Sequence, residues 1–366
     1  MKGETSTDDE IPFFKIGTFG GKADVFINRE RYEEYKSKYP YPKRGDVLIS
    51  AAGTIGRLVV FDGSESYFQD CNIVWVENNE TKITNECLYY ALQLARWKPS
   101  QGSTILRLYN DDIRAVDFFA PESLPDQKQV ASFLSAIDRK IALNRKRIAT
   151  LEAMAKEIYD YWFVQFDFPD AHGRPYKSSG GAMVYSPDLK REIPKGWEVK
   201  ALGELMTVCN GKDHKALADG DIPVYGSGGI MRRVNQKQYE GESVLIPRKG
   251  SLNNIMYANG PLWCIDTMFY TKEKVANVMK YIFMTIKDWD FAALDSGSAV
   301  PSMTAGLINQ LTIVFPERQY LSAFENQVSP LFSRWFSLEK EVAKLASLRD
   351  FLLPLLMNGQ VKIGDV

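Results

Sequence analysis

The chain has few of the residues that metalloproteins and many enzymes use for chemistry. Its 366 residues include two histidines, His172 and His214, and four cysteines that stand singly with no C-x-x-C pair. Zinc sites and disulfide frameworks both need such residues at short, regular spacings, so we expect neither. We interpret the cysteines as reduced packing residues, and we predict no metal site.

Long apolar runs and an excess of charge are also absent. No stretch of about 18 uninterrupted apolar residues occurs, and the amino end has no apolar signal core. We therefore expect a cytoplasmic protein with no membrane partner. The 45 basic and 46 acidic residues give a formal net charge of -1, which by itself does not indicate a nucleic-acid ligand. Local basic clusters rather than the total decide whether phosphate is bound.

The chain does contain an internal repeat. The stretch GDVLISAAGTIGRLVVF at 45–61 returns as GESVLIPRKGSLNNIMY at 241–257. Further matches continue downstream at a separation that shortens by one or two residues, as two diverged copies with small deletions would give. Upstream, Ile11 corresponds to Ile222, so the first copy carries extra residues that include RERYEEYKSKYP, expected as a surface loop or short helix.

Each copy has the pattern of a small α+β unit. Short apolar runs separated by Gly, Asn, Asp and Pro indicate strands, while 85–97 and 275–289 have the apolar spacing of helices. After each unit comes a long stretch whose apolar residues alternate by four and three. The positions of this seam are Val130, Leu134, Ile137, Ile141, Asn144, Ile148, Leu151, Ala155, Ile158 and Trp162 in the first copy, and Phe324, Val328, Leu331, Trp335, Leu338, Val342, Leu345, Arg349, Leu352 and Leu356 in the second.

This seam predicts two long helices that cover each other. Five heptads extend for roughly 55 Å, which is longer than a small domain can cover. Pairing two like units through the same face makes the helices antiparallel, with one α+β unit at each end and pseudo-two-fold symmetry. Two seam positions are not apolar, Asn144 and Arg349. Asn144 either fixes the register or faces water where the helices splay.

Sequence motifs for catalysis are missing. Gly53 and Gly56 begin like a phosphate-binding loop, but no G-x-x-x-x-G-K-[ST] string occurs, and the counterpart of Gly56 in the second copy is Asn253. We found no G-x-S-x-G, no [ND]-P-P-[YF] and no glycine-rich S-adenosylmethionine loop. We therefore predict no catalytic residues and no cofactor in this chain, and no thermal stabilisation by ATP or S-adenosylmethionine.

Three stretches carry a family resemblance. They are LPDQKQVASFLSAIDRKIALNRKRIATLEAMAKEIYDYWFVQFDFP at 124–169, IPKGWEVKALGEL at 193–205 and SLEKEVAKLASLRDFLLPLLMNGQV at 337–361. Together they resemble the specificity subunit of type I restriction-modification systems, in which two target recognition domains alternate with two long helices. The resemblance covers nearly the whole chain. It departs at the start, because nothing before Ile11 matches 193 to about 220.

The resemblance implies five segments. These are an amino-terminally short first target recognition domain at 1–123, a central long helix at 124–166, a linker at 167–192, a second target recognition domain at 193–317 and a carboxy-terminal long helix at 318–358.

The resemblance also implies a division of labour. This chain would read a two-part double-stranded DNA target, with half-sites roughly one to one and a half helical turns apart. Modification subunits would methylate adenine and restriction subunits would cut, using S-adenosylmethionine, ATP and Mg. The alternative is a stand-alone DNA-binding or coiled-coil scaffold protein without these partners.

Within this framework the glycine turns and a second repeated loop are our candidate DNA contacts, because they gather residue types that bind phosphate and base edges. The DNA-binding candidates are Lys43, Arg44, Thr54, Arg57, Arg107, Arg232, Arg233, Arg248, Lys249, Ser251, Asn253, Asn254 and Ser302. For partner subunits we predict outward-facing aromatic side chains near the end of the first long helix. These are Tyr159, Tyr161 and Phe163.

Overall fold

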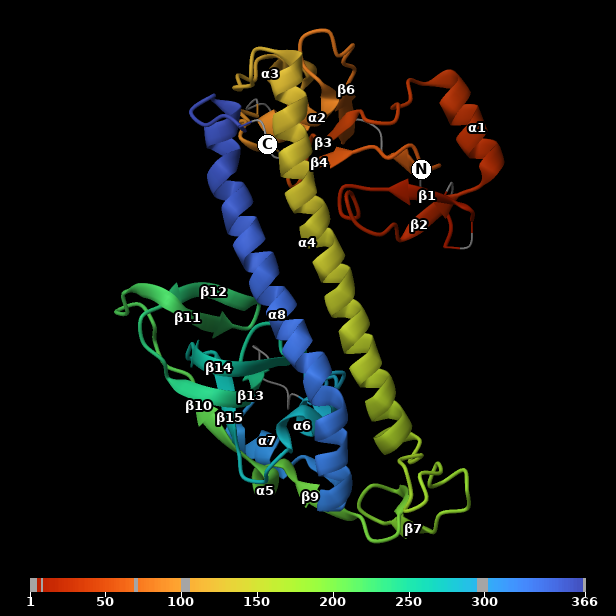
Figure 1. Ribbon diagram of the computed structural model, residues 1–366. Helices are drawn as coiled ribbons and strands as arrows, with labels where there is room; N and C mark the ends of the chain where they lie inside the picture. Colours follow the sequence, from red (N-terminus) through yellow and green to blue (C-terminus); the bar gives the residue numbers. More distant parts are fainter. Residues whose placement is uncertain (1–4, 8, 69–71, 100–105, 295–301, 365–366) are drawn as a thin grey trace. The chain divides into compact units, whose positions relative to one another are not determined.

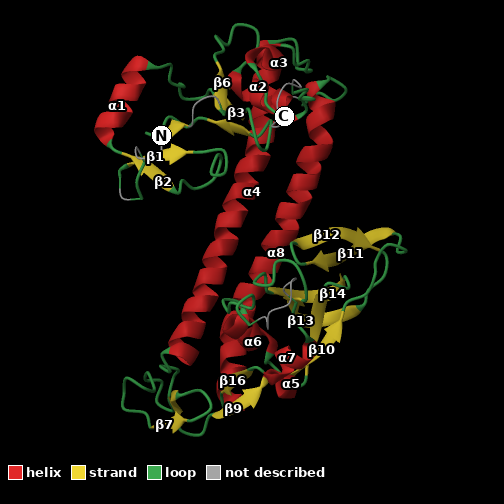
Figure 2. Ribbon diagram, turned by 180° about the vertical axis from the view of Figure 1, so that it is seen from behind, coloured by secondary structure: helices red, strands yellow, loops and turns green. Residues whose placement is uncertain are grey.

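The computed structural model describes residues 5–7, 9–68, 72–99, 106–294 and 302–364 (Figure 1). The chain divides into two compact units, each described here by itself. Unit 1 comprises 1–145 together with 339–366, and unit 2 comprises 146–338. Both are of the α+β type (Figure 2). Each long helix therefore contributes one part of its length to unit 1 and the other to unit 2.

Unit 1 contains two three-stranded sheets, in the orders β2-β1-β5 and β4-β3-β6. Its elements before the first long helix are β1 (Ile11–Phe14), β2 (Val25–Ile27), α1 (Arg29–Lys38), β3 (Val47–Ser50), β4 (Leu58–Val60), β5 (Tyr67–Phe68), β6 (Ile73–Val76), α2 (Asn85–Gln93) and α3 (Asn110–Arg114).

Unit 2 contains a six-stranded sheet in the order β10-β15-β13-β14-β11-β12 and two strand pairs, β16-β9 and β7-β8. Its elements outside the long helices are β7 (Met183–Ser186), β8 (Arg191–Pro194), β9 (Glu198–Ala201), α5 (Leu202–Leu205), β10 (Met206–Asn210), β11 (Asp219–Gly226), β12 (Gly229–Val234), β13 (Tyr239–Pro247), β14 (Met256–Cys264), β15 (Met268–Glu273), α6 (Met279–Ile286), α7 (Ala305–Gln310) and β16 (Thr312–Phe315).

The strand pairings confirm the internal repeat. In unit 1, β1 pairs in parallel with β5, and in unit 2 the corresponding β11 pairs in parallel with β14. The antiparallel pairing of β3 with β6 sets Ile49 opposite Val74, and that of β13 with β15 sets Ile246 opposite Phe269. These are the same repeat positions in both copies. The two copies therefore share strand connectivity and register, although their side chains differ.

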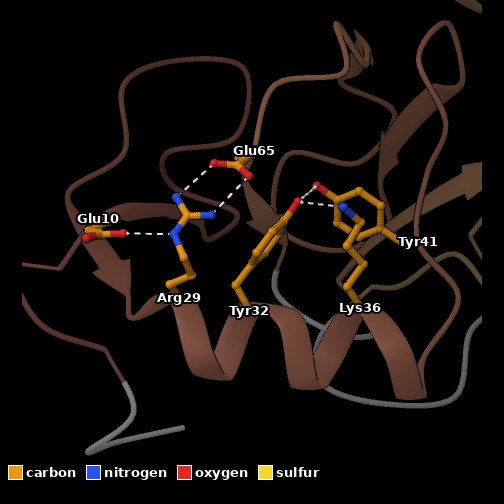
Figure 3. A network of polar contacts seen from close by, with 6 residues as sticks. All are labelled: Glu10, Arg29, Tyr32, Lys36, Tyr41 and Glu65. Atoms are coloured by element: carbon orange, nitrogen blue, oxygen red, sulfur yellow. Dashed lines mark hydrogen bonds and ion pairs between the residues drawn. The ribbon is translucent and has the colours of Figure 1, made fainter.

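The extra residues of the first copy form helix α1. Asn28 caps its amino end by accepting a hydrogen bond from the backbone of Arg31. Figure 3 shows how its side chains contact residues that precede β1 and β5: the Arg29 guanidinium bonds Glu10 and, with two parallel hydrogen bonds of 3.1 Å, Glu65. On the same helix the Tyr32 hydroxyl bonds that of Tyr41. Of the two alternatives that the sequence left open for these residues, a surface loop or a short helix, the structure has the helix.

Both predicted long helices are present: α4 (Leu124–Tyr159) and α8 (Arg318–Met357). In unit 1, seam residues Leu134 of α4 and Leu356 of α8 lie in one buried cluster that also includes Tyr90 of α2. In unit 2, Trp162 and Phe324 lie in another buried cluster. Helices from the globular parts therefore cover some of the seam, because α2 and α6 pack into the same clusters as the long helices.

The segment 167–192 is more ordered than the linker expected from its Pro, Gly and Ser content. It contains β7, which pairs antiparallel with the whole of β8. Phe168 stacks on Trp197 with ring centroids 4.8 Å apart. Asp167 accepts hydrogen bonds from the backbone and the hydroxyl of Ser178. The segment predicted as a linker therefore has regular structure, since these contacts fix it against the rest of unit 2.

Candidate nucleic-acid interface

The same glycine turn follows the central strand of each unit. Gly53 after β3 and Gly250 after β13 have φ of +67° and +84°, in the left-handed region that favours glycine. In both turns the amide two residues later donates to the glycine carbonyl, Ile55 at 3.0 Å and Leu252 at 2.9 Å. In the sequence Gly53 begins like a phosphate-binding loop, but such a loop does not explain why both units share this turn. The shared turn is explained by a tight connection between a buried strand and an exposed loop.

The structure places the second predicted loop against this turn in both units. An isolated β-bridge joins Ala52 to Arg107 in unit 1, and another joins Lys249 to Ser302 in unit 2. Beside each bridge a backbone hydrogen bond repeats: Leu108 donates to Ala51 at 2.8 Å, and Met303 donates to Arg248 at 2.9 Å. Residues far apart in sequence thus form one two-loop surface per unit. The Gly-Ser pairs at 102–103 and 297–298, which pointed to this loop, lie outside the described residues.

Each of these surfaces carries two basic residues, and those of unit 2 are the more exposed. Arg248, Lys249 and Ser251 are exposed, and none of them forms an ion pair with a residue in the described part of the chain. Among the described residues there is thus no salt bridge that these side chains must give up to meet a ligand. Ser302, half-buried, completes the surface through its bridge to Lys249.

The two asparagines of this turn are engaged within the protein. Asn253 donates from Nδ2 to Asp290 at 3.0 Å and accepts from the backbone of Ala292 at 3.0 Å. Asn254 donates to the carbonyl of Ser227 at 2.7 Å. Both side chains therefore shape the loop, and part of their hydrogen-bonding capacity is used within the protein.

Arg232 and Arg233 lie on β12, at the edge of the sheet. Arg232 bonds Asp219 at 2.6 Å and the carbonyl of Leu217, and Arg233 bonds the carbonyl of Asp221 at 2.6 Å. These contacts tie β12 to the segment that leads into and forms β11. The two arginines are separate in the sheet from the glycine turn on β13.

In unit 1 the candidates form two groups. Thr54 and Arg57 lie at the glycine turn, where Arg57 donates to the carbonyl of Phe19 at 2.9 Å. Arg107 bonds Asn72 at 2.6 Å beside the same turn. Lys43 and Arg44, also exposed, precede β3 and are therefore at the opposite end of that strand from Gly53. These two residues, upstream of the turn in sequence, thus form a group of their own.

Two of the three predicted partner contacts do not face outward. Tyr159 and Phe163 are 8% and 2% exposed, because α6 covers them: the Tyr159 hydroxyl bonds Thr285 at 3.1 Å, and Phe163 lies 4.7 Å from the ring of Tyr281. Burial raises the pKa of Tyr159 to about 12. Tyr161, 38% exposed, is the one that keeps the predicted orientation. The π-helical turn at Asp160–Val164 lies in this segment.

Other chemistry is not indicated in the described part of the chain. No group of three or more His, Cys, Asp or Glu residues there is arranged to hold a metal ion. Cys87, Cys209 and Cys264 are free thiols, and burial raises the pKa of Cys87 to about 11 and that of Cys264 to about 12. Cys71 lies outside the described residues. Among the helices that are described, none is long and apolar enough to span a bilayer.

The fold and these paired surfaces define an internally duplicated α+β protein with one two-loop surface per copy. Comparison with known proteins identifies the family. The model of the type I restriction modification DNA specificity domain matches this chain twice, over residues 2–153 and 194–323, and the chain belongs to that family.

Curated proteins that are similar to this chain are named as members of the same family. A putative type I restriction enzyme specificity subunit of Haemophilus influenzae is 50% identical over 138 residues, which are 38% of this chain and 36% of that relative. The MjaIX specificity subunit of Methanocaldococcus jannaschii is 24% identical over 360 residues, 89% of this chain and 79% of that one. The chain thus spans about a third of the first relative and most of the second.

A solved structure shows the same fold. The crystal structure of a type I restriction-modification S subunit from M. genitalium aligns with a TM-score of 0.58, covering 98% of this chain and 91% of that one at 18% identity. The role that the family defines is DNA-sequence specificity in a type I system.

Proposed function

We propose that this chain reads a bipartite double-stranded DNA target, one half with each unit. The observation that carries the proposal is the repeated two-loop surface, in which a β-bridge holds the glycine turn against the second loop in both copies. In the described part of the loops, the glycine turn and the bridge repeat while the side chains differ. Such a pair suits recognition of two different half-sites, since base edges are read by side chains.

The long helices fit a role as the spacer between the half-sites. We propose that α4 and α8 form an antiparallel coiled coil, which relates the two recognition domains by a pseudo-two-fold axis. The apolar seam and the shared buried clusters support this arrangement. The domain boundaries expected from the sequence, 1–123, 193–317 and the two helices, belong to the same proposal.

The chemistry would reside in partner subunits. In this proposal modification subunits methylate adenine, restriction subunits cut, and these partners use S-adenosylmethionine, ATP and Mg, while the chain itself binds no cofactor and catalyses nothing. The missing catalytic motifs support this assignment, as do the relatives, which are named specificity subunits of restriction enzymes. Tyr161 remains our candidate for a partner contact.

Methylome sequencing of host DNA with and without this gene tests the proposal. We expect a two-part adenine-methylation motif to disappear on deletion and to return when the gene is restored. An unchanged methylome would contradict the proposal and favour a stand-alone DNA-binding or scaffold protein. Co-purification of an adenine methyltransferase with the chain separates the same two alternatives.

A further inference from the structure

The two repeats differ in how two of their strand edges are covered. In unit 2 the segment Glu198–Asn210 forms β9, α5 and β10. Strand β9 pairs with β16, with Val199 opposite Val314, and β10 pairs with β15, with Val208 opposite Thr271. One continuous stretch of chain thus closes two separate edges.

This segment also completes the core of unit 2. Leu202, Leu205 and Met206 are each fully buried in the main apolar cluster. Opposite β9, Ile313 and Val314 are 3% and 4% exposed. The segment therefore contributes main-chain hydrogen bonds at two edges and apolar burial between them.

In unit 1 the counterpart of β16 is uncovered. By the repeat, 117–120 corresponds to 312–315, but it forms no strand, and none of its amides donates a backbone hydrogen bond to a described residue. Phe118 and Phe119, the counterparts of Ile313 and Val314, are 40% and 74% exposed. Two aromatic side chains stand in solvent where the other copy has two buried aliphatic ones.

The counterpart of β15 is open as well. Strand β6 lies at the end of its sheet, with β3 on one side and no described strand on the other, whereas β15 has β13 on one side and β10 on the other. Val74 and Trp75 of β6 are only half-buried, and β6 borders a cleft of about 400 Å³ that Tyr39, Tyr41 and Tyr67 also line. The same two edges that Glu198–Asn210 closes in unit 2 are thus, in unit 1, not paired with any described strand.

We propose that unit 1 is an acceptor for a strand–helix–strand segment of the Glu198–Asn210 type. Its first strand would pair antiparallel with 117–120 and cover Phe119, and its second would pair antiparallel with β6. Adding a strand to an open edge satisfies main-chain groups, while side-chain pockets give selectivity. The occupant is defined chemically: apolar residues at the positions of Val199, Leu202, Leu205 and Val208.

A synthetic peptide with the sequence of residues 193–211 provides the test. Fluorescence anisotropy of the labelled peptide with the full chain should give saturable binding, and a scrambled peptide should give none. Hydrogen exchange should slow at 74–78 and 117–120 when the peptide binds. Absence of saturable binding would overturn the proposal. So would protection changes confined to 312–315, which would mean strand exchange in unit 2.

Two matched variants locate the site. Phe119→Asp places a charge on the proposed contact and should weaken peptide binding at least about tenfold. Tyr185→Asp makes the same kind of change at an aromatic residue of unit 2 that is 64% exposed, and should leave binding unchanged. Because both side chains are largely exposed, neither variant should alter thermal unfolding. Equal binding by Phe119→Asp would overturn the assignment of the edge.

The inference does not rest on DNA reading. Arg248→Ala, a change in the proposed DNA surface of unit 2, should bind the peptide as the unmodified chain does. Failure of peptide binding would leave the methylome result untouched, and the reverse also holds.

Discussion

At the scale of single residues, Arg248 is the sharpest test of the DNA surface. It is exposed, follows β13 directly, and its carbonyl holds the second loop through Met303. Arg248→Ala removes only the side chain, so the loop pairing should persist. If Arg248 contacts a phosphate, affinity should fall by about 1–3 kcal/mol and the slope of log K against log salt by about one.

The measurement is a salt titration of binding to DNA carrying the methylated motif. Lys237→Ala is the matched control, since Lys237 is an exposed basic residue of the same unit that already forms an ion pair with Glu240. We expect it to change affinity by less than about 1 kcal/mol. If Arg248→Ala left both the affinity and its salt slope unchanged, Arg248 would not be part of the interface.

Asn144 is a second residue whose environment yields a prediction. Its side chain is fully buried, and neither its amide nitrogen nor its oxygen has a hydrogen-bond partner in the described part of the chain. Of the two alternatives that the sequence left open, exposure to water is therefore wrong. A buried amide without partners costs about 1–3 kcal/mol.

Asn144→Leu should accordingly raise the free energy of unfolding by about 1 kcal/mol or more, measured by urea denaturation. Asn144→Asp keeps the shape and introduces a buried charge, so it should lower stability. A less stable Leu variant would mean that Asn144 is instead satisfied by water or selects the register of the helices.

At the scale of elements, there is a structural reason why Arg349 stands at an otherwise apolar position of the seam. Arg349 of α8 donates to Asp138 of α4 at 2.7 Å, and the other oxygen of Asp138 accepts from the Tyr90 hydroxyl of α2 at 2.8 Å. One carboxylate therefore links three helices of unit 1. The polar seam position holds α8 to the globular part as well as to α4.

Arg349→Leu makes the seam more apolar, yet we expect it to destabilise unit 1 by about 1.5–3 kcal/mol, because Asp138 loses a charged donor while remaining partly buried. Urea unfolding and hydrogen exchange of 346–357 would measure this. Lys140→Ala breaks the Lys140–Glu341 pair between the same two helices, whose side chains are 44% and 38% exposed, and should cost less than about 1 kcal/mol. A stabilised Leu variant would show that apolar burial outweighs the ion pair.

At the scale of the whole molecule, the proposed spacer role gives a geometric prediction. Inserting one heptad into both α4 and α8 lengthens each helix by about 10 Å while keeping the seam in phase. The gap between the two halves of the methylated motif should grow by about three base pairs, the number that this length spans along DNA. Methylome sequencing would read the new spacing directly.

Insertion into α4 alone is the control. It shifts one helix against the other by seven residues, so we expect loss of methylation without a new motif. An unchanged spacing in the double insertion would contradict a spacer role for the helices.

Much of this fold follows from the sequence because its signals are local. The repeat was visible because two stretches keep the same glycine turn after the same apolar strand. The long helices were visible because apolar residues return every three and four positions over five heptads. Such patterns report backbone conformation and which face is buried, without needing any distant contact.

The tertiary structure decided whatever depends on residues distant in sequence. The β-bridges that join each glycine turn to its second loop pair residue 52 with residue 107, and residue 249 with residue 302. Tyr159 and Phe163 became core residues because α6 packs over them, and helical spacing alone could not reveal that neighbour. The open edges of unit 1 emerged only when its strands were compared with those of unit 2. A sequence pattern indicates which face of an element is apolar, but packing determines what covers that face.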